Sequence, residues 1–217
     1  MQNSTLRDML PFFSRLPFHD TLSLPKQYAL FRSGQKTNNL YLLTEGFVKE
    51  FRIGTNGNPA LYTFYQRGDL IGLKEFLSGK LFLTEGLCID PVTVKIISVN
   101  ELEKQIIQDT VLSKLICELL IQKSELIQAQ LFYLVTKNLR GRLAFILLHI
   151  LTNYGVDTSG ALILKLTRTD LASYANMNTA NVIRTLAAFC QEKLIRTEKR
   201  NIWITNESHL KRVLETQ

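Results

Sequence analysis

The segment from Leu166 to Leu186 constrains the fold most, because its residues predict two short helices joined by a tight turn. Thr167 and Asp170 form a Thr-x-x-Asp pair, which predicts a capping box at the start of the first helix. Residues 176–178 then interrupt the apolar spacing, and asparagine tolerates the left-handed conformation of such a turn. The second helix is expected to begin after Asn178 and to bury Val182, Leu186 and Phe189. The pattern predicts a helix-turn-helix, with an ordinary amphipathic hairpin as the alternative.

The distribution of charge favours a nucleic acid as the partner of this segment. Residues 137–217 contain 12 Lys and Arg against 6 Asp and Glu, whereas residues 1–136 contain 14 against 13. An excess of positive charge in one part of a chain is typical of proteins that bind polyanions. The basic residues are scattered over several elements and form no single amphipathic stripe, which favours DNA over a membrane surface. On the second helix the outward residues Thr179, Asn181 and Arg184 can enter a major groove.

A small sheet is predicted around this helical pair. Residues 194–197 and 202–205 predict two strands, and the polar residues 198–201 predict the turn between them. Residues 161–166 are expected to supply a third strand, and Trp203 is expected in the core. The result would be a winged helix in which Lys199 and Arg200 meet a phosphate backbone at the wing tip, or form a solvated turn.

The first hundred residues predict a different architecture. Glycines recur at intervals of 12, 11, 11 and 11 residues, at Gly34, Gly46, Gly57, Gly68 and Gly79. Strand-like runs lie between and after them, at residues 40–43, 47–53, 61–65 and 92–98. The sequence Asn56-Gly57-Asn58 is a strong hairpin signal. Short strands with turns at this spacing predict an all-β barrel or sandwich.

Residues 101–153 predict a long helical stretch between these two parts. Two apolar stripes run along it: Leu112, Leu115, Leu119, Leu126 and Tyr133, and beside them Ile116, Leu120, Ile127, Leu131 and Leu134. One stripe can face the β unit while the other faces a second copy, which predicts a homodimer with Leu119 and Leu126 at its seam. The alternative is a single chain that covers both stripes.

With these three parts, the chain resembles the CRP/FNR family of bacterial transcription regulators. The resemblance rests on Phe31-x-x-Gly34, Glu45-Gly46, Gly68-Asp69-Leu70-Ile71-Gly72, Gly141-Arg142-Leu143-Ala144, Leu166-Thr167-Arg168-x-Asp170-Leu171-Ala172 and Leu194-Ile195. It implies an α+β fold with a cupin-like β-roll sensor of the cyclic-nucleotide-binding type at residues 1–100. It further implies a dimerisation helix region at 101–137 and a winged helix-turn-helix at 138–217. The implied partners are palindromic double-stranded DNA, a second copy of the chain and RNA polymerase.

The resemblance also implies where the sites lie. The DNA-binding candidates are Arg168, Thr169, Asn178, Thr179, Asn181, Arg184, Lys199 and Arg200. The candidates for an effector pocket are Gly72, Leu73, Lys74, Phe82, Leu83 and Thr84. Many family members carry Arg-Glu after the cap of the recognition helix, where this chain has Thr179-Ala180, so their usual half-site is not expected. Arg184 is instead expected to read guanine, and the amide of Asn181 to read adenine in an A·T-leaning half-site.

Two known sensor chemistries are not expected. Family members that bind cyclic nucleotide have a Glu after the Gly-Asp-x-x-Gly turn and then an Arg-Ser pair, whereas here Leu73 takes the Glu position and residues 82–84 offer no Arg. A buried phosphate without a cationic partner is costly. Members with an iron–sulfur cluster use N-terminal cysteines, whereas Cys88, Cys117 and Cys190 cannot provide four ligands. No cofactor is therefore predicted, and core packing is the expected role of these cysteines.

Other classes of protein fit the sequence less well. A metal enzyme on a cupin-like barrel needs clustered histidines, but His19, His149 and His209 lie outside the predicted strands, so no enzyme is expected. A protein-interaction or signalling module that uses the β-roll and the basic lobe remains the alternative to a DNA-binding regulator. Residues 1–9 do not resemble a signal peptide and no run reaches transmembrane length, so a cytoplasmic protein without membrane contact is expected.

Overall fold

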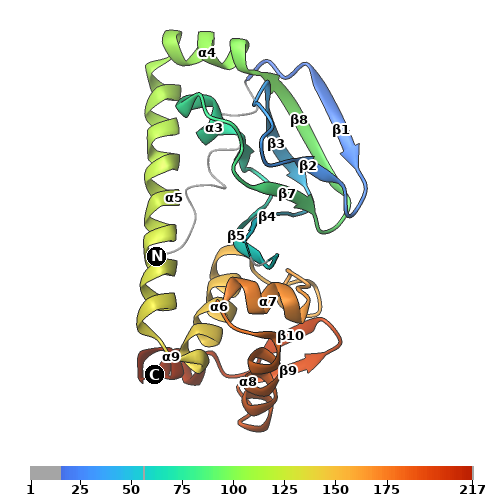
Figure 1. Cartoon of the computed structure of the whole chain (residues 1–217), viewed down its shortest axis with the longest axis vertical. Coiled ribbons are helices and arrows are strands. Elements are labelled where there is room, and N and C mark those ends of the chain that lie inside the picture. The colour runs from blue at the N-terminus through green and yellow to red at the C-terminus, as the bar shows by residue number, and fades with distance from the viewer. Residues whose placement is uncertain (1–15, 56, 217) are drawn as a thin grey trace. The chain divides into compact units, whose positions relative to one another are not determined.

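The computed structural model describes residues 16–55 and 57–216 (Figure 1). These residues divide between Lys123 and Ser124 into two compact units. We call them the β unit, up to Lys123, and the C-terminal unit, from Ser124. The prediction for residues 1–9 lies outside the described residues, and so does Asn56 of the predicted hairpin. The chain as described has mixed helices and strands, and its α+β fold class is confirmed.

Two antiparallel four-stranded sheets make up the β unit. Their strands are β1 Asp20–Leu24, β2 Ala29–Phe31, β3 Asn39–Glu45, β4 Val48–Ile53, β5 Pro59–Tyr65, β6 Leu70–Ile71, β7 Glu85–Cys88 and β8 Val92–Ser98. One sheet has the order β1-β8-β3-β6 and the other the order β2-β7-β4-β5. All four predicted strand runs are present, and β4 and β5 form an antiparallel hairpin. The predicted strands of this part are therefore confirmed, and the short helix α3, Leu73–Ser78, lies among them.

The five regularly spaced glycines all adopt positive φ, between 64° and 97°. Residues other than glycine rarely adopt this backbone conformation. At Gly46, between β3 and β4, a Cβ atom would lie 2.3 Å from the carbonyl oxygen of Pro91. Glycine is therefore required there both by the backbone angle and by the contact, which explains the Glu45-Gly46 motif.

Polar residues divide the predicted helical stretch into separate helices. After the short α3, Leu73–Ser78, come α4 Val99–Gln108, α5 Thr110–Thr136 and α6 Leu139–Tyr154. The carboxylate of Asp109 accepts hydrogen bonds from the backbone N–H groups of Val111 and Leu112 at the start of α5. Asn138 caps α6 in the same way by accepting from the N–H of Gly141. Short polar side chains compete for backbone groups, which explains why the helix breaks at these two positions.

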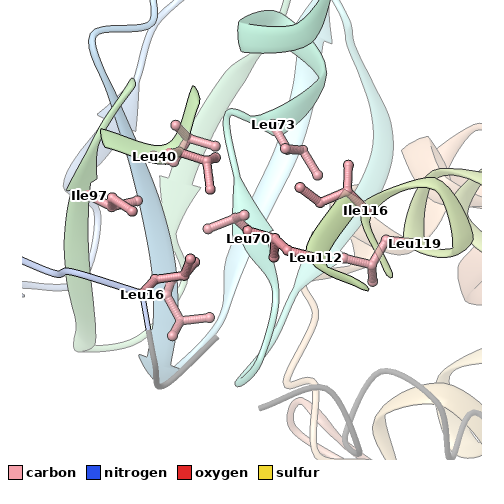
Figure 2. Close-up of a cluster of buried hydrophobic side chains, with 10 residues drawn as sticks. Leu16, Leu40, Leu70, Leu73, Ile97, Leu112, Ile116 and Leu119 are labelled. Atoms are coloured by element: carbon pink, nitrogen blue, oxygen red, sulfur yellow. The ribbon is translucent and has the colours of Figure 1, made fainter. Parts of the chain in front are cut away.

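The β unit has a core that α5 completes, and this corrects the predicted seam. Leu112, Ile116 and Leu119 point from α5 toward Leu40, Leu70, Leu73 and Ile97 (Figure 2). Leu119 is only 3% exposed, so it belongs to this core and not to a dimer seam. Ile127 and Leu131, in contrast, are 64% and 60% exposed. The two predicted stripes do not correspond to two separate faces of α5. The face that the β unit covers takes Leu112 and Leu119 from one stripe and Ile116 from the other.

The C-terminal unit contains the predicted helix-turn-helix. Its elements after α6 are α7 Arg168–Tyr174, α8 Thr179–Gln191, β9 Ile195–Glu198, β10 Asn201–Ile204 and α9 Glu207–Thr216. The capping box of Thr167 and Asp170 is present at the start of α7. Asn176 adopts φ 48° in the turn, and the side chain of Asn178 accepts a hydrogen bond from the N–H of Asn181 at 2.7 Å. The predicted start of each helix is therefore confirmed.

The predicted third strand is wrong, because β9 and β10 form a two-stranded sheet without residues 161–166. The N–H of Leu162 donates to the carbonyl of Ile202 in β10 at 2.8 Å, and an isolated bridge joins Leu162 to Val156. The carbonyl of Leu162, however, accepts from Nζ of Lys165 at 2.9 Å. Backbone groups bonded to several different partners cannot form a regular ladder.

Trp203 was expected in the core and is instead half-buried. Its indole N–H donates to the carbonyl of Ser159 at 3.0 Å, and the guanidinium of Arg196 lies 3.7 Å from the ring centroid. The neighbouring Ile202 is the buried side chain of this strand. Because side chains alternate along a strand, burial of Ile202 directs Trp203 toward the other face, where its N–H and its ring face both have partners.

Candidate nucleic-acid interface and sensor pocket

The polar residues predicted to face DNA lie along the exposed side of α8. Thr179 is its first residue, Asn181 follows in the first turn and Arg184 is exposed one turn later. The Arg184 guanidinium donates a hydrogen bond from Nη2 to Oδ1 of Asn181 at 2.5 Å. The opposite side of the helix is buried through Val182, Thr185, Leu186 and Phe189. One side of α8 is thus held by the unit's core, and the other presents polar and cationic groups.

The tip of the wing is tied to the start of α7. Lys199 and Arg200 are exposed in the turn between β9 and β10. Arg168, the first residue of α7, donates from Nη2 to the carbonyl of Lys199 at 3.3 Å, and the next residue, Thr169, is exposed. The structure therefore brings Arg168 and the two wing residues together, as a shared phosphate-binding surface requires.

Two arginines that the sequence reading gave no role brace the helix-turn-helix. Arg142 in α6 donates to the carbonyl of Lys137 at 2.8 Å and to the carbonyl of Asn176 at 3.2 Å. Arg140 donates two hydrogen bonds, of 2.9 and 2.8 Å, to the carboxylate of Glu192, which directly follows α8. These hydrogen bonds hold the pKa of Glu192 below its usual range. Two cations at the start of an apolar helix were a signal in the sequence, but their partners lie too far along the chain to be inferred from it.

An aromatic cluster joins α6 to α7. The ring of His149 lies 5.6 Å from that of Phe145, 6.2 Å from that of Tyr154 and 6.0 Å from that of Tyr174 between centroids. Its Nδ1 lies 3.0 Å from the side-chain nitrogen of Asn153. Burial lowers the pKa of His149 to about 4. The histidine is therefore neutral at pH 7 and acts as a packing residue of the DNA-binding unit.

In the β unit, an aromatic pair occupies the region of the predicted effector pocket. The rings of Phe31 and Phe82 stack with centroids 4.2 Å apart. A Cβ atom on Gly86 would lie 2.2 Å from the Phe31 ring, so this ring lies directly on the β7 backbone. A Cβ on Gly72 would lie 3.6 Å from Cζ of Phe82. Gly72 and Phe82 are thus close together, and the side chain of Thr37 and the carbonyl of Asn39 lie similarly close to Gly72.

A buried carboxylate lies beside the same segment. Glu50 is 7% exposed and accepts hydrogen bonds from Oγ1 of Thr84 at 2.6 Å and from the Tyr65 hydroxyl at 2.5 Å. Burial and the Glu50 charge raise the pKa of Tyr65 well above its usual value. Nζ of Lys123 in α5 lies 5.0 Å from the Tyr65 ring centroid. A phosphate bound at Thr84 would lie beside the Glu50 carboxylate, which disfavours an anion at this position.

The other pocket candidates lie elsewhere. Leu73 belongs to the core that α5 completes (Figure 2). The side chain of Lys74 is 66% exposed and its Nζ lies 3.1 Å from the Glu75 carboxylate, while Leu83 is exposed at the surface. The six candidates therefore do not gather around one point.

The cysteines occupy three different environments. Cys88 is buried, and burial raises the pKa of its thiol to about 11. Cys190 is half-buried, with Sγ 3.6 Å from Oγ1 of Thr197. Cys117 was expected in the core but is exposed, because it lies on a side of α5 that the β unit does not cover.

Within residues 16–55 and 57–216, no cluster of three or more His, Cys, Asp or Glu is arranged to hold a metal ion. In the same ranges, no helix combines the length and apolar character needed to cross a membrane.

Two family models match the chain, one on each unit. A cyclic nucleotide-binding domain matches residues 21–109, and a Crp-like helix-turn-helix domain matches residues 141–213. The first range contains the eight strands of the β unit, apart from Asp20, together with α3 and α4. The second range contains α6 to α9 apart from their outermost residues. The two matches follow each other in the order that the motifs predict.

Known proteins similar to the chain are transcription regulators. The anaerobic regulatory protein of Bacillus subtilis (strain 168) is 24% identical over 81% of this chain and 75% of its own length. A CRP-like cAMP-activated global transcriptional regulator of Mycobacterium tuberculosis is 23% identical over 88% of this chain and 86% of its own. The structure of FixK2 from Bradyrhizobium japonicum has a TM-score of 0.81 at 19% identity, covering 89% of this chain and 96% of that one. A CRP/FNR-family regulator from Thermus thermophilus has a TM-score of 0.76 at 20% identity, covering 90% and 98%. The chain belongs to the CRP/FNR family of DNA-binding transcription regulators, which are not enzymes.

Proposed function

We propose that two copies of this chain bind one palindromic DNA site, with α8 of each copy in a major groove. The observation that carries the proposal is the C-terminal unit itself: a capped α8 exposes Arg184, and Arg168 holds the cationic wing tip. In a two-fold dimer of this kind the half-sites lie about 34–36 Å apart, one helical turn of DNA. The protein acts in the cytoplasm, where RNA polymerase is the partner that the family resemblance implies.

The exposed side of α5 supports the dimer. Next to the core residues, a second row of mostly apolar residues follows the helix at alternating intervals of three and four. The row consists of Cys117, Leu120, Ser124, Ile127, Leu131 and Leu134. A repeat of this kind forms the seam of a two-stranded coiled coil. Leu131, Ile127 and the nearby Val135 are all more than half exposed in the single chain. A second copy of α5 would bury these side chains.

Duplex binding at several salt concentrations tests the proposal. Neutralising several phosphates per dimer should make the logarithm of the affinity fall steeply with the logarithm of salt, with a slope of several. A protein-interaction module without a DNA site would show neither this slope nor a selected sequence.

Arg184→Ala is expected to weaken specific binding and to relax base preference at one position of each half-site. An arginine bonded to O6 and N7 of guanine contributes about 1–3 kcal/mol of discrimination. Selection of binding sites from a random library, with the wild type in parallel, measures the effect. A variant that selects the wild-type motif unchanged would contradict the assignment.

Arg200→Ala and Arg168→Ala are expected to weaken binding to all sequences alike. Each should lower the salt slope by about one, because phosphate contacts carry no sequence information. Arg168 also holds the carbonyl of Lys199, so its loss should have the larger effect of the two. Titration of specific and random duplexes at matched salt measures both. A changed motif in either variant would place that arginine on a base instead.

Cyclic AMP is expected neither to bind nor to change DNA affinity. Apolar Phe82 and the Glu50 carboxylate bonded to Thr84 stand where the nucleotide phosphate would need a cation. Calorimetric titration of the purified protein with cyclic AMP, with and without DNA, measures this. Saturable heat at micromolar ligand would contradict the expectation and would point to Lys74 or Lys80 as the missing cation.

A further inference from the structure

Asn181 and Arg184 form a pair on the exposed side of α8 that limits what each can do. They lie three residues apart, and the guanidinium of Arg184 donates to the side-chain oxygen of Asn181. The backbone of Asn181 is fixed in turn, because its N–H donates to the side chain of Asn178 at 2.7 Å. The acceptor for Arg184 therefore sits on a residue that the helix cap holds in place.

This contact competes with a direct role for Asn181 in reading adenine. Such readout needs the amide oxygen to accept from adenine N6 while the amide nitrogen donates to N7. In the structure the amide oxygen of Asn181 already accepts from Arg184. Reading adenine would require this oxygen to turn its second lone pair toward the base, or the bond from Arg184 to break.

The same contact suits Arg184 for guanine. A guanidinium has five N–H groups, so one can remain on Asn181 while two others bond to O6 and N7 of guanine. Arginine otherwise has several rotatable bonds to order on binding, and a side chain held beforehand loses less conformational freedom. The side-chain oxygen of Asn181, one turn away in the same helix, restrains the Arg184 side chain in this way before DNA binds.

We propose that Asn181 is a positioning residue, which holds Arg184 in the orientation that reads guanine and does not itself read a base. This replaces the adenine role expected from its amide. The proposal rests on the proposed function and adds to it a single guanine per half-site, whose recognition depends on two residues.

Three single variants of the full-length dimer, together with one double variant, distinguish positioning of Arg184 from direct base reading by Asn181. The single variants are Asn181→Ala, Asn181→Asp and Arg184→Ala. Each is compared with the wild type by site selection and then by competition between duplexes that differ at one base pair. Asn181→Ala should reduce discrimination at the same base pair as Arg184→Ala, by at least about fivefold. Asn181→Asp should keep the guanine preference, because a carboxylate also accepts from Arg184, although the added negative charge should lower affinity for every sequence. The double variant Asn181→Ala with Arg184→Ala should be no less selective at that position than Arg184→Ala alone.

Direct reading by Asn181 gives a different pattern. Asn181→Ala would then relax a second base pair and leave the guanine preference intact, and Asn181→Asp would lose the second preference as well. Either result would overturn the inference while leaving the proposed function in place. A wild-type protein that selects no motif would overturn both. Gln191→Ala, at the exposed end of α8, is the matched control and should select the wild-type motif.

Discussion

Replacing both Ile127 and Leu131 with lysine is expected to produce monomers and to weaken binding to a palindromic site by about 10²–10⁴-fold. Both side chains are largely exposed in the single chain and stand on the proposed seam of α5. Burying such a side chain contributes about 1.5–3 kcal/mol, and a two-fold dimer buries each of them twice. Lysines there would face like charges across the seam and would lose hydration without a partner. The loss of DNA affinity follows because each half-site would then be bound by an independent monomer.

Sedimentation and DNA titration at micromolar protein measure the two effects. Ala129→Lys is the matched control, because Ala129 is exposed on a different side of α5 and should leave the dimer intact. Leu119→Lys is unsuitable, since it would place a charge in the core of the β unit and unfold it. A wild-type protein that is already monomeric at this concentration would contradict the proposal that α5 forms a dimer interface.

Acid is expected to destabilise the C-terminal unit between about pH 6.5 and pH 4 through His149. Burial lowers the pKa of this histidine to about 4 in the folded protein, whereas an unfolded histidine titrates near 6.5. The unfolded chain therefore binds a proton that the folded chain does not, and the stability present above pH 6.5 is lost as the pH falls toward 4. The difference corresponds to about 3 kcal/mol. His149→Phe should remove this pH dependence, because phenylalanine keeps the ring in the cluster and has nothing to protonate.

Urea unfolding at several pH values, followed by tryptophan fluorescence, measures this effect. The chain has a single tryptophan, Trp203, so the signal reports the C-terminal unit. His19→Phe is the control, because its side chain is exposed on the β unit, and it should retain the wild-type pH dependence. The hydrogen bond from Lys165 is the chief cause of the lowered pKa of Asp157. The stability that Asp157 contributes is fully present above about pH 4 and is lost only at lower pH, outside the range in which His149 acts. Equal pH slopes for wild type and His149→Phe would show that His149 is hydrated in the folded protein.

Where local chemistry decides the structure, the sequence was sufficient. The capping box at Thr167, the left-handed Asn176 and the cap at Asn178 depend on groups a few residues apart, and all three are present. The glycine spacing predicted the turns of the β-roll for the same reason: each turn needs its positive φ locally.

Contacts between distant segments were decided only by the tertiary structure. Which apolar residues of α5 are buried depends on the β-roll that covers Leu119 and leaves Leu131 exposed, and periodicity alone cannot show which face is covered. The placing of Trp203 and the loss of the third strand depend on hydrogen bonds to Ser159 and Lys165. At the candidate site, the residue types of α8 were readable, but the bond between Arg184 and Asn181 was not. Sequence thus determined the elements through interactions within a turn, and the fold determined the roles of side chains through partners brought together by packing.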